Sequence, residues 1–190
     1  MIITISGTPG SGKSTVAKIL VEKLHAERLY IGGTLRDLAR KKGMTLAELM
    51  DFAKVHPEID VEVDNAVAAQ AREFDKAGKM VVVEGRMQFY FLPESIKFFI
   101  KVSFEEAARR IWKDLQQKEI SAQRNEGRIN SLEEMKKSVI KREEEDASRY
   151  KKLYGVDYLN EKQYDLVVDS TSISAMQCAE LILNFIEKFE

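Results

Sequence analysis

Residues 7–14 read Gly7-Thr8-Pro9-Gly10-Ser11-Gly12-Lys13-Ser14 and follow directly on an apolar, β-branched stretch at 2–5. Apolar side chains then recur at helical spacing from Val16 to Leu24, so the segment predicts a strand, a glycine-rich turn and a helix in that order. In such a turn, successive backbone N–H groups converge at the positive end of the helix and bind a polyphosphate. The segment therefore predicts a phosphate-binding loop at the start of an α/β fold.

Each position of this loop has a predicted part in binding a nucleoside triphosphate. The glycines let the backbone turn tightly, and Lys13 reaches the outer phosphates. The Ser14 hydroxyl binds the Mg²⁺ ion that neutralises the phosphate charge, while Thr15 begins the helix and binds an inner phosphate. The predicted nucleotide site consists of Gly7, Thr8, Pro9, Gly10, Ser11, Gly12, Lys13, Ser14 and Thr15.

The composition of the 190-residue chain narrows the class of partner. A net charge of -1 gives no overall attraction to nucleic acid or to an anionic membrane, so local arginine and lysine clusters must hold any bound anion. Cys178 has no cysteine or histidine close in sequence with which to bind a metal. No apolar run approaches membrane-spanning length, and the first residues show neither the basic n-region nor the cleavage site of a signal peptide, so we expect neither export nor anchoring. We expect one cytoplasmic domain that acts on small molecules and binds neither nucleic acid nor membrane.

Five apolar runs alternate with helical patterns along the chain, at 2–5, 29–31, 80–83, 96–102 and 166–168. This alternation predicts an α/β fold with a five-stranded parallel sheet flanked by helices. Capping-box spacing marks helix starts at Thr45, Ser131 and Ser174, and Pro57 suits the first turn of another helix. No heptad pattern indicates a coiled-coil partner, so we expect a monomer.

Two stretches stand out from this alternation. The segment from about 41 to 78 predicts a helical insertion after the second strand. The segment from about 116 to 130 is polar, with little apolar periodicity, and is either a mobile lid or an ordinary solvated loop. Within it, Arg124 and Arg128 either close on phosphates or form soluble surface, and Arg110 on the preceding helix is placed to serve a lid hinge.

The segments by which GTP hydrolases bind their base and magnesium are absent, so phosphoryl transfer to a second substrate is the stronger hypothesis. Such transfer requires an arginine-rich acceptor site that neutralises charge between two anions. Arg36 lies at the start of a helix after the second strand, where both the helix N-terminus and the guanidinium attract phosphate. Glu84 and Arg86 follow the third strand, at the sheet edge where ligands collect. Glu84 either orients Mg²⁺ through a water or caps the adjoining loop.

The helix expected from 131 to 153 carries aliphatic side chains on one side at 132, 135 and 139. The same line continues to Arg142, Asp146 and Arg149. An unpaired buried charge is costly, so a core-facing line that changes from aliphatic to charged predicts an arginine-lined cleft. The alternative is a helical ion pair between Arg142 and Asp146, with Arg149 in solvent.

Three other acids have less specific surroundings. Asp169 follows a strand and precedes a helix cap, which favours a role in shaping a loop beside the nucleotide base. Asp60 and Asp64 share one side of a helix and are expected to be solvated.

Taken together, the motifs GTPGSGKST, YIGGTLRDLA, VVVEGR, KREEEDASRY and YDLVVDSTS resemble those of the nucleoside monophosphate kinases, and in particular the archaeal-type cytidylate kinases. The resemblance covers essentially the full chain and implies a P-loop kinase fold with a helical monophosphate-binding insertion and a short lid. It implies that Arg36 and Arg149 hold the acceptor phosphate, that Arg142 and Asp146 approach its ribose, and that Arg86 lies against its base. By the same resemblance, Arg110 looks like the arginine that leads into the lid.

The predicted reaction is transfer of the terminal phosphate of ATP to CMP and dCMP. Lys13, Arg110 and Arg149 are the predicted catalytic residues, and Ser14 and Glu84 the predicted Mg²⁺ site. The acceptor phosphate is already anionic, so electrostatics and exclusion of water suffice without a general base. Alternatives are a kinase for AMP, UMP or a small anionic metabolite such as shikimate, or a nucleotide-dependent regulatory module without kinase activity.

Overall fold

A computed structural model describes residues 1–117 and 129–188 of the chain. Five parallel strands form one sheet, as the sequence predicts, and their order is β2-β3-β1-β4-β5. The strands are β1 (Ile2–Gly7), β2 (Glu27–Tyr30), β3 (Val81–Glu84), β4 (Ile96–Lys101) and β5 (Leu166–Asp169). Ile31, expected at the end of a strand, is instead the first residue of the helix that follows β2.

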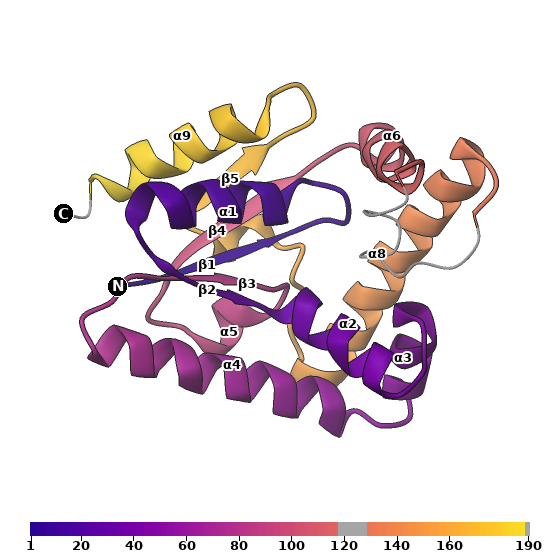
Figure 1. The fold of residues 1–190 in the computed structure, drawn as a ribbon, viewed down its shortest axis with the longest axis horizontal. Coiled ribbons are helices and arrows are strands. Elements are labelled where there is room, and N and C mark those ends of the chain that lie inside the picture. The colour runs from indigo at the N-terminus through magenta and orange to yellow at the C-terminus, as the bar shows by residue number, and fades with distance from the viewer. Residues whose placement is uncertain (118–128, 189–190) are drawn as a thin grey trace.

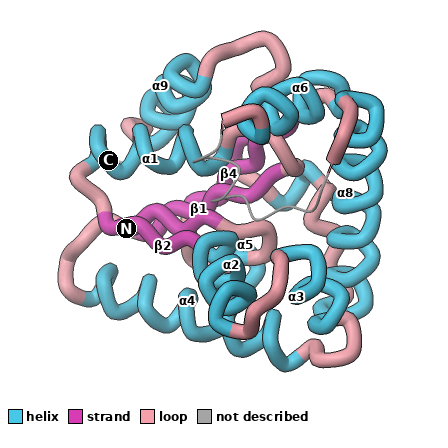
Figure 2. The backbone as a smooth tube through the Cα atoms, turned by 45° about the vertical axis from the view of Figure 1, so that its right-hand side comes forward, coloured by secondary structure: helices cyan, strands magenta, loops and turns pink. Residues whose placement is uncertain are grey.

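Helices cover both faces of the sheet and gather at one end of it (Figure 1). Those on one face are α1 (Lys13–Leu24) and α9 (Ala175–Ile186), and those on the other are α4 (Glu58–Lys76) and α5 (Gln88–Phe91). The helices α2 (Ile31–Lys41), α3 (Leu46–Ala53), α6 (Phe104–Leu115) and α8 (Leu132–Tyr154) lie toward the carboxyl ends of the strands (Figure 2). A short 3₁₀ helix, η1 (Glu161–Gln163), precedes β5.

The central strands are buried on both faces, as expected for a parallel sheet covered by helices. Ile3 and Ile5 of β1 pack with Leu20 of α1 and Ile182 of α9, and all four side chains are fully buried. A second core under the other face includes Val81 and Val83 of β3 with Val67, Ala68 and Ala71 of α4. These two cores give the carboxyl ends of β1 and β3 a rigid base.

The helix caps follow the predicted chemistry with one difference. Thr45 and Ser174 form complete capping boxes with Glu48 and Gln177. Ser131 accepts a hydrogen bond from the Glu134 N–H, but the Glu134 carboxylate accepts from the backbone N–H of Asn130 instead of that of Ser131. Pro57 precedes the first helical residue of α4.

One predicted core residue is on the surface. Leu132, expected to begin the inward side of α8, is 45% exposed, whereas Met135 and Val139 are buried. Leu132 is the first residue of the helix, and α6 packs against α8 through a buried cluster that begins at Met135. The inward line therefore starts one turn later than the sequence pattern indicates.

The two segments that stand out in the sequence, about 41–78 and about 116–130, have different outcomes. The segment 41–78 contains α3 and α4, but the middle of α4 belongs to the core beneath the sheet, so the segment is only partly an addition to it. Most of the predicted lid, with Arg124 and Arg128, lies outside the described residues. Of the described helices, none is both long enough and apolar enough to cross a membrane.

Candidate active site

The loop between β1 and α1 has the backbone conformation that its glycines predict. Gly7 has φ +145°, and a Cβ atom there would lie 2.0 Å from the carbonyl oxygen of Ile100. Gly12, the residue before α1, has φ +86°, a value that L side chains rarely adopt. Within the described chain, no side chain caps α1 and no acid occupies its first turn. The backbone N–H groups at the start of α1 are therefore suited to an anion.

Lys13 is folded back on this loop. Its Nζ donates to the carbonyl oxygens of Gly7 at 2.8 Å and Thr8 at 2.6 Å. Burial, with a further contribution from the charge of Arg86, lowers the pKa of Lys13 to about 7. A polyphosphate would bring the negative charge that favours the protonated form, so nucleotide binding and the protonation of Lys13 are coupled.

Glu84 at the end of β3 faces the start of α1. Its Oε1 accepts a hydrogen bond from the Ser14 hydroxyl at 2.5 Å, and its Oε2 accepts one from Arg28 Nη2 at 2.7 Å. A hydroxyl and a carboxylate beside a phosphate-binding loop are donors of the kind that Mg²⁺ takes together with phosphate oxygens. The predicted metal pair is thus brought together.

Arg28 and Tyr30 were not predicted as site residues, although both side chains lie beside predicted ones. The Arg28 guanidinium also lies over the Tyr30 ring, 4.9 Å from its centroid. Arg36 Nη1 in turn donates to the Tyr30 hydroxyl at 2.7 Å and to the carbonyl oxygen of Gly32 at 3.0 Å. The sequence feature that could have indicated them is an arginine two residues before a tyrosine at the carboxyl end of a strand, because side chains two residues apart lie on the same face of a sheet.

A second charged cluster lies beyond the loop, where α8 meets β3 and α4. Asp146 is in ion pairs with Arg86 Nε at 3.0 Å and with Arg149 Nη2 at 3.0 Å, and Arg149 Nε lies 3.1 Å from Asp60. Burial opposes the charged form of Asp146, but Arg86 and Arg149 outweigh burial and hold its pKa below the ordinary value. The Arg149 side chain is 9% exposed, so the alternative that left it in solvent is wrong. We call Arg86, Asp146, Arg149 and Asp60 the acceptor-side network.

Asp60 and Asp64 correct an expectation. Both were expected in solvent, but their exposed fractions are 4% and 6%. Arg149 of α8 pairs with Asp60, and Gln88 of α5 donates to Asp64 Oδ1 at 2.8 Å, so α4 carries its acids on a side that other elements cover. Their spacing placed them on one face of the helix, but it could not indicate which distant side chains meet that face.

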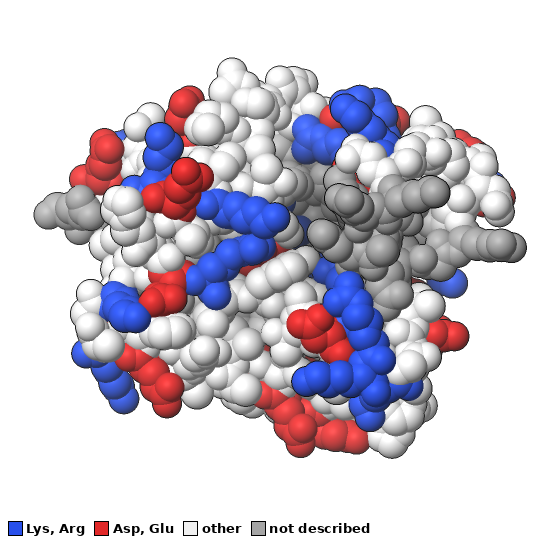
Figure 3. Space-filling model, in the orientation of Figure 1, with Lys and Arg blue, Asp and Glu red and all other residues white. Residues whose placement is uncertain are grey.

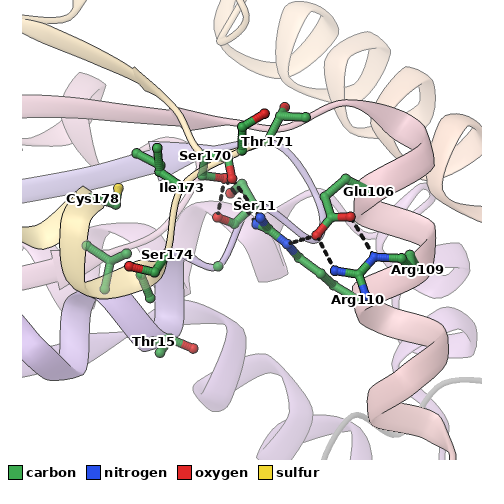
Figure 4. A pocket seen from close by; sticks show the side chains of 14 residues that line it. Ser11, Thr15, Glu106, Arg109, Arg110, Ser170, Thr171, Ile173, Ser174 and Cys178 are labelled. Atoms are coloured by element: carbon green, nitrogen blue, oxygen red, sulfur yellow. Dashed lines mark hydrogen bonds and ion pairs between the residues drawn. The ribbon is translucent and has the colours of Figure 1, made fainter.

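A cavity of about 480 Å³ lies against the phosphate-binding loop (Figure 4). Its lining includes Ser11 and Thr15, the turn at 170–174 and Arg110 of α6. Arg110 Nη2 donates to the carbonyl oxygen of Ser170 at 2.6 Å, and Arg110 Nε to Glu106 Oε1 at 2.7 Å. Arg110 thus ties α6 to the turn after β5.

The acids around this cavity support its shape. Hydrogen bonds from Arg109 and then Arg110 lower the pKa of Glu106 to about 2, although burial opposes the shift. Asp169 accepts from the Thr171 N–H at 2.9 Å and so shapes the turn, as the sequence predicts. Glu106 was not predicted as a site residue. Its position four residues before Arg110 on one helix could have indicated that the two side chains pair.

Charge on the surface is mixed. On the face in Figure 3, lysines and arginines lie in small groups with acids close by, and no single basic surface extends across it. In the acceptor-side network the Arg149 and Arg86 side chains are 9% and 17% exposed, and acids accompany both. Two largely buried arginines thus lie at this site.

Comparison with known proteins agrees with this arrangement. The family described as "AAA domain" matches residues 3–148. A cytidylate kinase of Archaeoglobus fulgidus is 38% identical over 192 residues, which cover 98% of this chain and 95% of that protein. A cytidylate kinase of Methanococcoides burtonii is 33% identical, covering 90% of this chain and 88% of that protein. A shikimate kinase from Acinetobacter baumannii, solved with shikimate, has the same fold, with a TM-score of 0.57, 18% identity and coverage of 100% of this chain and 94% of that one.

The family match and the cytidylate kinase relatives, together with the phosphate-binding loop and the buried arginines beside it, identify the class as the ATP-dependent nucleoside monophosphate kinases. Within that class, similarity to the Archaeoglobus protein extends over nearly the whole of both chains. The chain belongs to the cytidylate kinase family.

Proposed function

We propose that the protein transfers the terminal phosphate of ATP to CMP and to dCMP. The observation that carries this proposal is the acceptor-side network, a buried cluster of arginines and aspartates close enough to the phosphate-binding loop that Arg86 and Asp146 both influence the pKa of Lys13. A protein that only bound ATP would have no need of a second cluster of buried arginines, held in place by aspartates, at this position.

On the donor side, the triphosphate lies over the start of α1, where Lys13 reaches its outer phosphates and Thr15 an inner one. Ser14 and Glu84 hold Mg²⁺, which neutralises phosphate charge when bound. The adenine occupies the cavity beside Arg110 and the 170–174 turn. This assignment is supported by the cavity's position against the loop and by hydrogen-bonding groups of Ser11 and Ser170 at its wall.

On the acceptor side, Arg36 and Arg149 bind the monophosphate, Arg142 and Asp146 approach the ribose, and Arg86 lies against the base. An acceptor phosphate oxygen attacks the terminal phosphorus of ATP, a new P–O bond forms, and the bond to the bridging oxygen of ADP breaks. Lys13, Arg110 and Arg149 stabilise the negative charge as it shifts, and no general base is required because the attacking oxygen is already ionised.

The surrounding chain serves this reaction by closing over it. We propose that α3 with the start of α4 closes over the acceptor, that the segment at 116–130 closes over the phosphates, and that closure excludes water as the acceptor. The protein acts as a cytoplasmic monomer on free nucleotides, without nucleic acid or membrane. Size-exclusion chromatography with light scattering tests the oligomeric state.

A coupled assay of ADP formation with ATP and Mg²⁺, across CMP, dCMP, UMP, AMP and shikimate, tests the proposal. We expect the highest kcat/KM with CMP and measurable turnover of dCMP. Preference for AMP, UMP or shikimate would replace CMP as the acceptor and keep the kinase. Tight ATP binding with no stimulation by any of these acceptors would favour a regulatory module instead.

A further inference from the structure

One buried carboxylate in the described chain has no part in the mechanism above. Asp64 lies on α4 one helical turn after Asp60, is 6% exposed, and forms no ion pair with a described cation. Its Oδ1 accepts from Gln88 Nε2 at 2.8 Å and its Oδ2 from the Tyr154 hydroxyl at 3.3 Å. A carboxylate has room for about four hydrogen bonds, so Asp64 retains acceptor capacity.

The side chain of Gln88, which contacts Asp64, also has unused hydrogen-bonding capacity. The residue is fully buried, and its Oε1 has no hydrogen-bond partner among the described residues. Its amide nitrogen is used by Asp64, so the unpaired oxygen belongs to the same group that contacts the carboxylate. A buried acceptor without a donor costs free energy, and a native structure retains such a group where something else satisfies it.

A purely structural role explains the pair poorly. An amide at position 64 would join α4 to Gln88 and Tyr154 without placing a carboxylate in the interior, where burial and the nearby Asp60 raise the pKa of Asp64 to about 7. A structural pair would also leave no reason for the Gln88 oxygen to remain unsatisfied. An acceptor without a donor, next to a carboxylate with remaining acceptor capacity, is instead suited to a ligand group with two N–H bonds.

The pair borders the acceptor site from two elements. Gln88 lies two residues after Arg86, which the proposed function places against the base, and Asp64 follows the Asp60 that pairs with Arg149. Both side chains are covered in this arrangement, so a base reaches them only when the surrounding elements open. The proposed closing of α3 and the start of α4 over the acceptor requires such an open state before the acceptor binds.

We infer that Asp64 and Gln88 form the specificity site for the acceptor base and recognise its exocyclic amino group. This inference rests on the proposed function and deepens it. Cytosine carries an amino group that donates one N–H to Asp64 and one to Gln88 Oε1. Uracil carries a carbonyl oxygen at the same position and would set an acceptor against two acceptors, so the site rejects the oxo base.

The test compares nucleotide pairs that differ only in amino against oxo, CMP with UMP and AMP with IMP, by kcat/KM. We expect the D64N variant to lower the CMP to UMP ratio by about tenfold or more, because the new amide donates to the oxo group. Q88L, which removes the unpaired oxygen, lowers the same ratio mainly by weakening CMP. Where AMP and IMP are both turned over, their ratio moves in the same direction.

Two variants distinguish recognition from support. E62Q makes the same chemical change at an exposed position of α4, and Y154F removes the other hydrogen bond to Asp64 while leaving both acceptors; both keep the wild-type ratio. If D64N fails to fold, the Q88L ratio decides. A CMP to UMP ratio within twofold of wild type in folded D64N and Q88L overturns the inference and leaves the proposed function standing. A wild-type protein that does not phosphorylate CMP overturns the proposed function itself.

Discussion

The donor and acceptor sides of the active site are built by different means. On the donor side, the loop suited to phosphate is one continuous segment, 7–15, whose glycines fix its shape. The acceptor side depends on side chains from the turn after β3 and from α4, α5 and α8, several of which lie far apart in the sequence. A loop of backbone groups binds phosphate with little cost to folding, whereas a buried set of charges must remain paired for the fold to be stable. Variants on the two sides should therefore fail in different ways.

The largest expected effect is on the donor side. K13A removes the cation that neutralises charge in the transition state, and we expect kcat to fall by about 10³-fold. Because the buried ammonium is removed, the melting temperature stays the same or rises. The coupled assay and thermal unfolding by circular dichroism measure the two effects. Turnover within tenfold of wild type would contradict the role of Lys13.

The acceptor side should lose stability as well as activity. R149M leaves Asp60 and Asp146 buried without one of their partners, and we expect the free energy of unfolding to fall by about 3–5 kcal/mol. Denaturant titration gives the value, and the KM for CMP rises in the folded fraction. R109M is the matched control: its ion pair with Glu106 is exposed, so we expect a loss of less than about 1 kcal/mol. Equal losses in the two variants would remove the contrast between the two sides.

Proton uptake sharpens the description of the donor side. The pKa of Lys13 is about 7 in the free protein, and a bound polyphosphate raises it, so ATP binding at pH 8 takes up close to one proton. At pH 6 the lysine is already protonated and uptake falls toward zero. Calorimetry in two buffers of different ionisation enthalpy measures the difference. K13M should abolish it; uptake that persists in K13M would assign the proton to another group.

The same shift has a consequence for stability. In the unfolded chain Lys13 titrates near its ordinary pKa of 10.5, so between pH 7 and 10.5 the unfolded state binds more protons than the native state. The contribution of Lys13 to the free energy of unfolding therefore increases with pH over that window. Denaturant titrations at pH 7 and pH 9 should show this increase in wild type and a smaller one in K13M.

The smallest expected effect concerns Arg28, which shares Glu84 with Ser14. Removing the guanidinium in R28M frees one carboxylate oxygen, and we expect the half-saturating Mg²⁺ concentration to fall by about threefold, as for one partly exposed charge. E84Q should shift it the other way. Titrations of Mg²⁺ at fixed ATP, read by both turnover and tryptophan fluorescence, compare the two. Shifts in the same direction would show that Arg28 does not compete for Glu84.

The contrast also explains what the sequence could predict. The parallel sheet, the loop at 7–15 and the pairing of Ser14 with Glu84 follow from the alternation of strands and helices, from local motifs and from where strands end. Asp60 and Asp64 were misplaced because their burial depends on Arg149 and Gln88, which reach them from other elements. Arg28 was missed because its partner is set by the register of β2 beside β3, which local pattern does not fix.

Leu132 and Arg149 show the limit of periodicity within one helix. The periodic pattern placed both on the inward side of α8. Only Arg149 is covered by a neighbouring element, α4, whose Asp60 pairs with it, whereas Leu132 is 45% exposed. Periodicity gives the face of a helix, but the extent of the neighbouring element decides where along that face burial begins.

The central claim is that ATP and the monophosphate occupy their separate sites at the same time and react directly. Initial rates measured while ATP and CMP are both varied test this claim most directly. The account predicts double-reciprocal lines that intersect, as required for a ternary complex. Parallel lines, together with a phosphorylated protein isolated after incubation with ATP alone, would show transfer through the protein and contradict it.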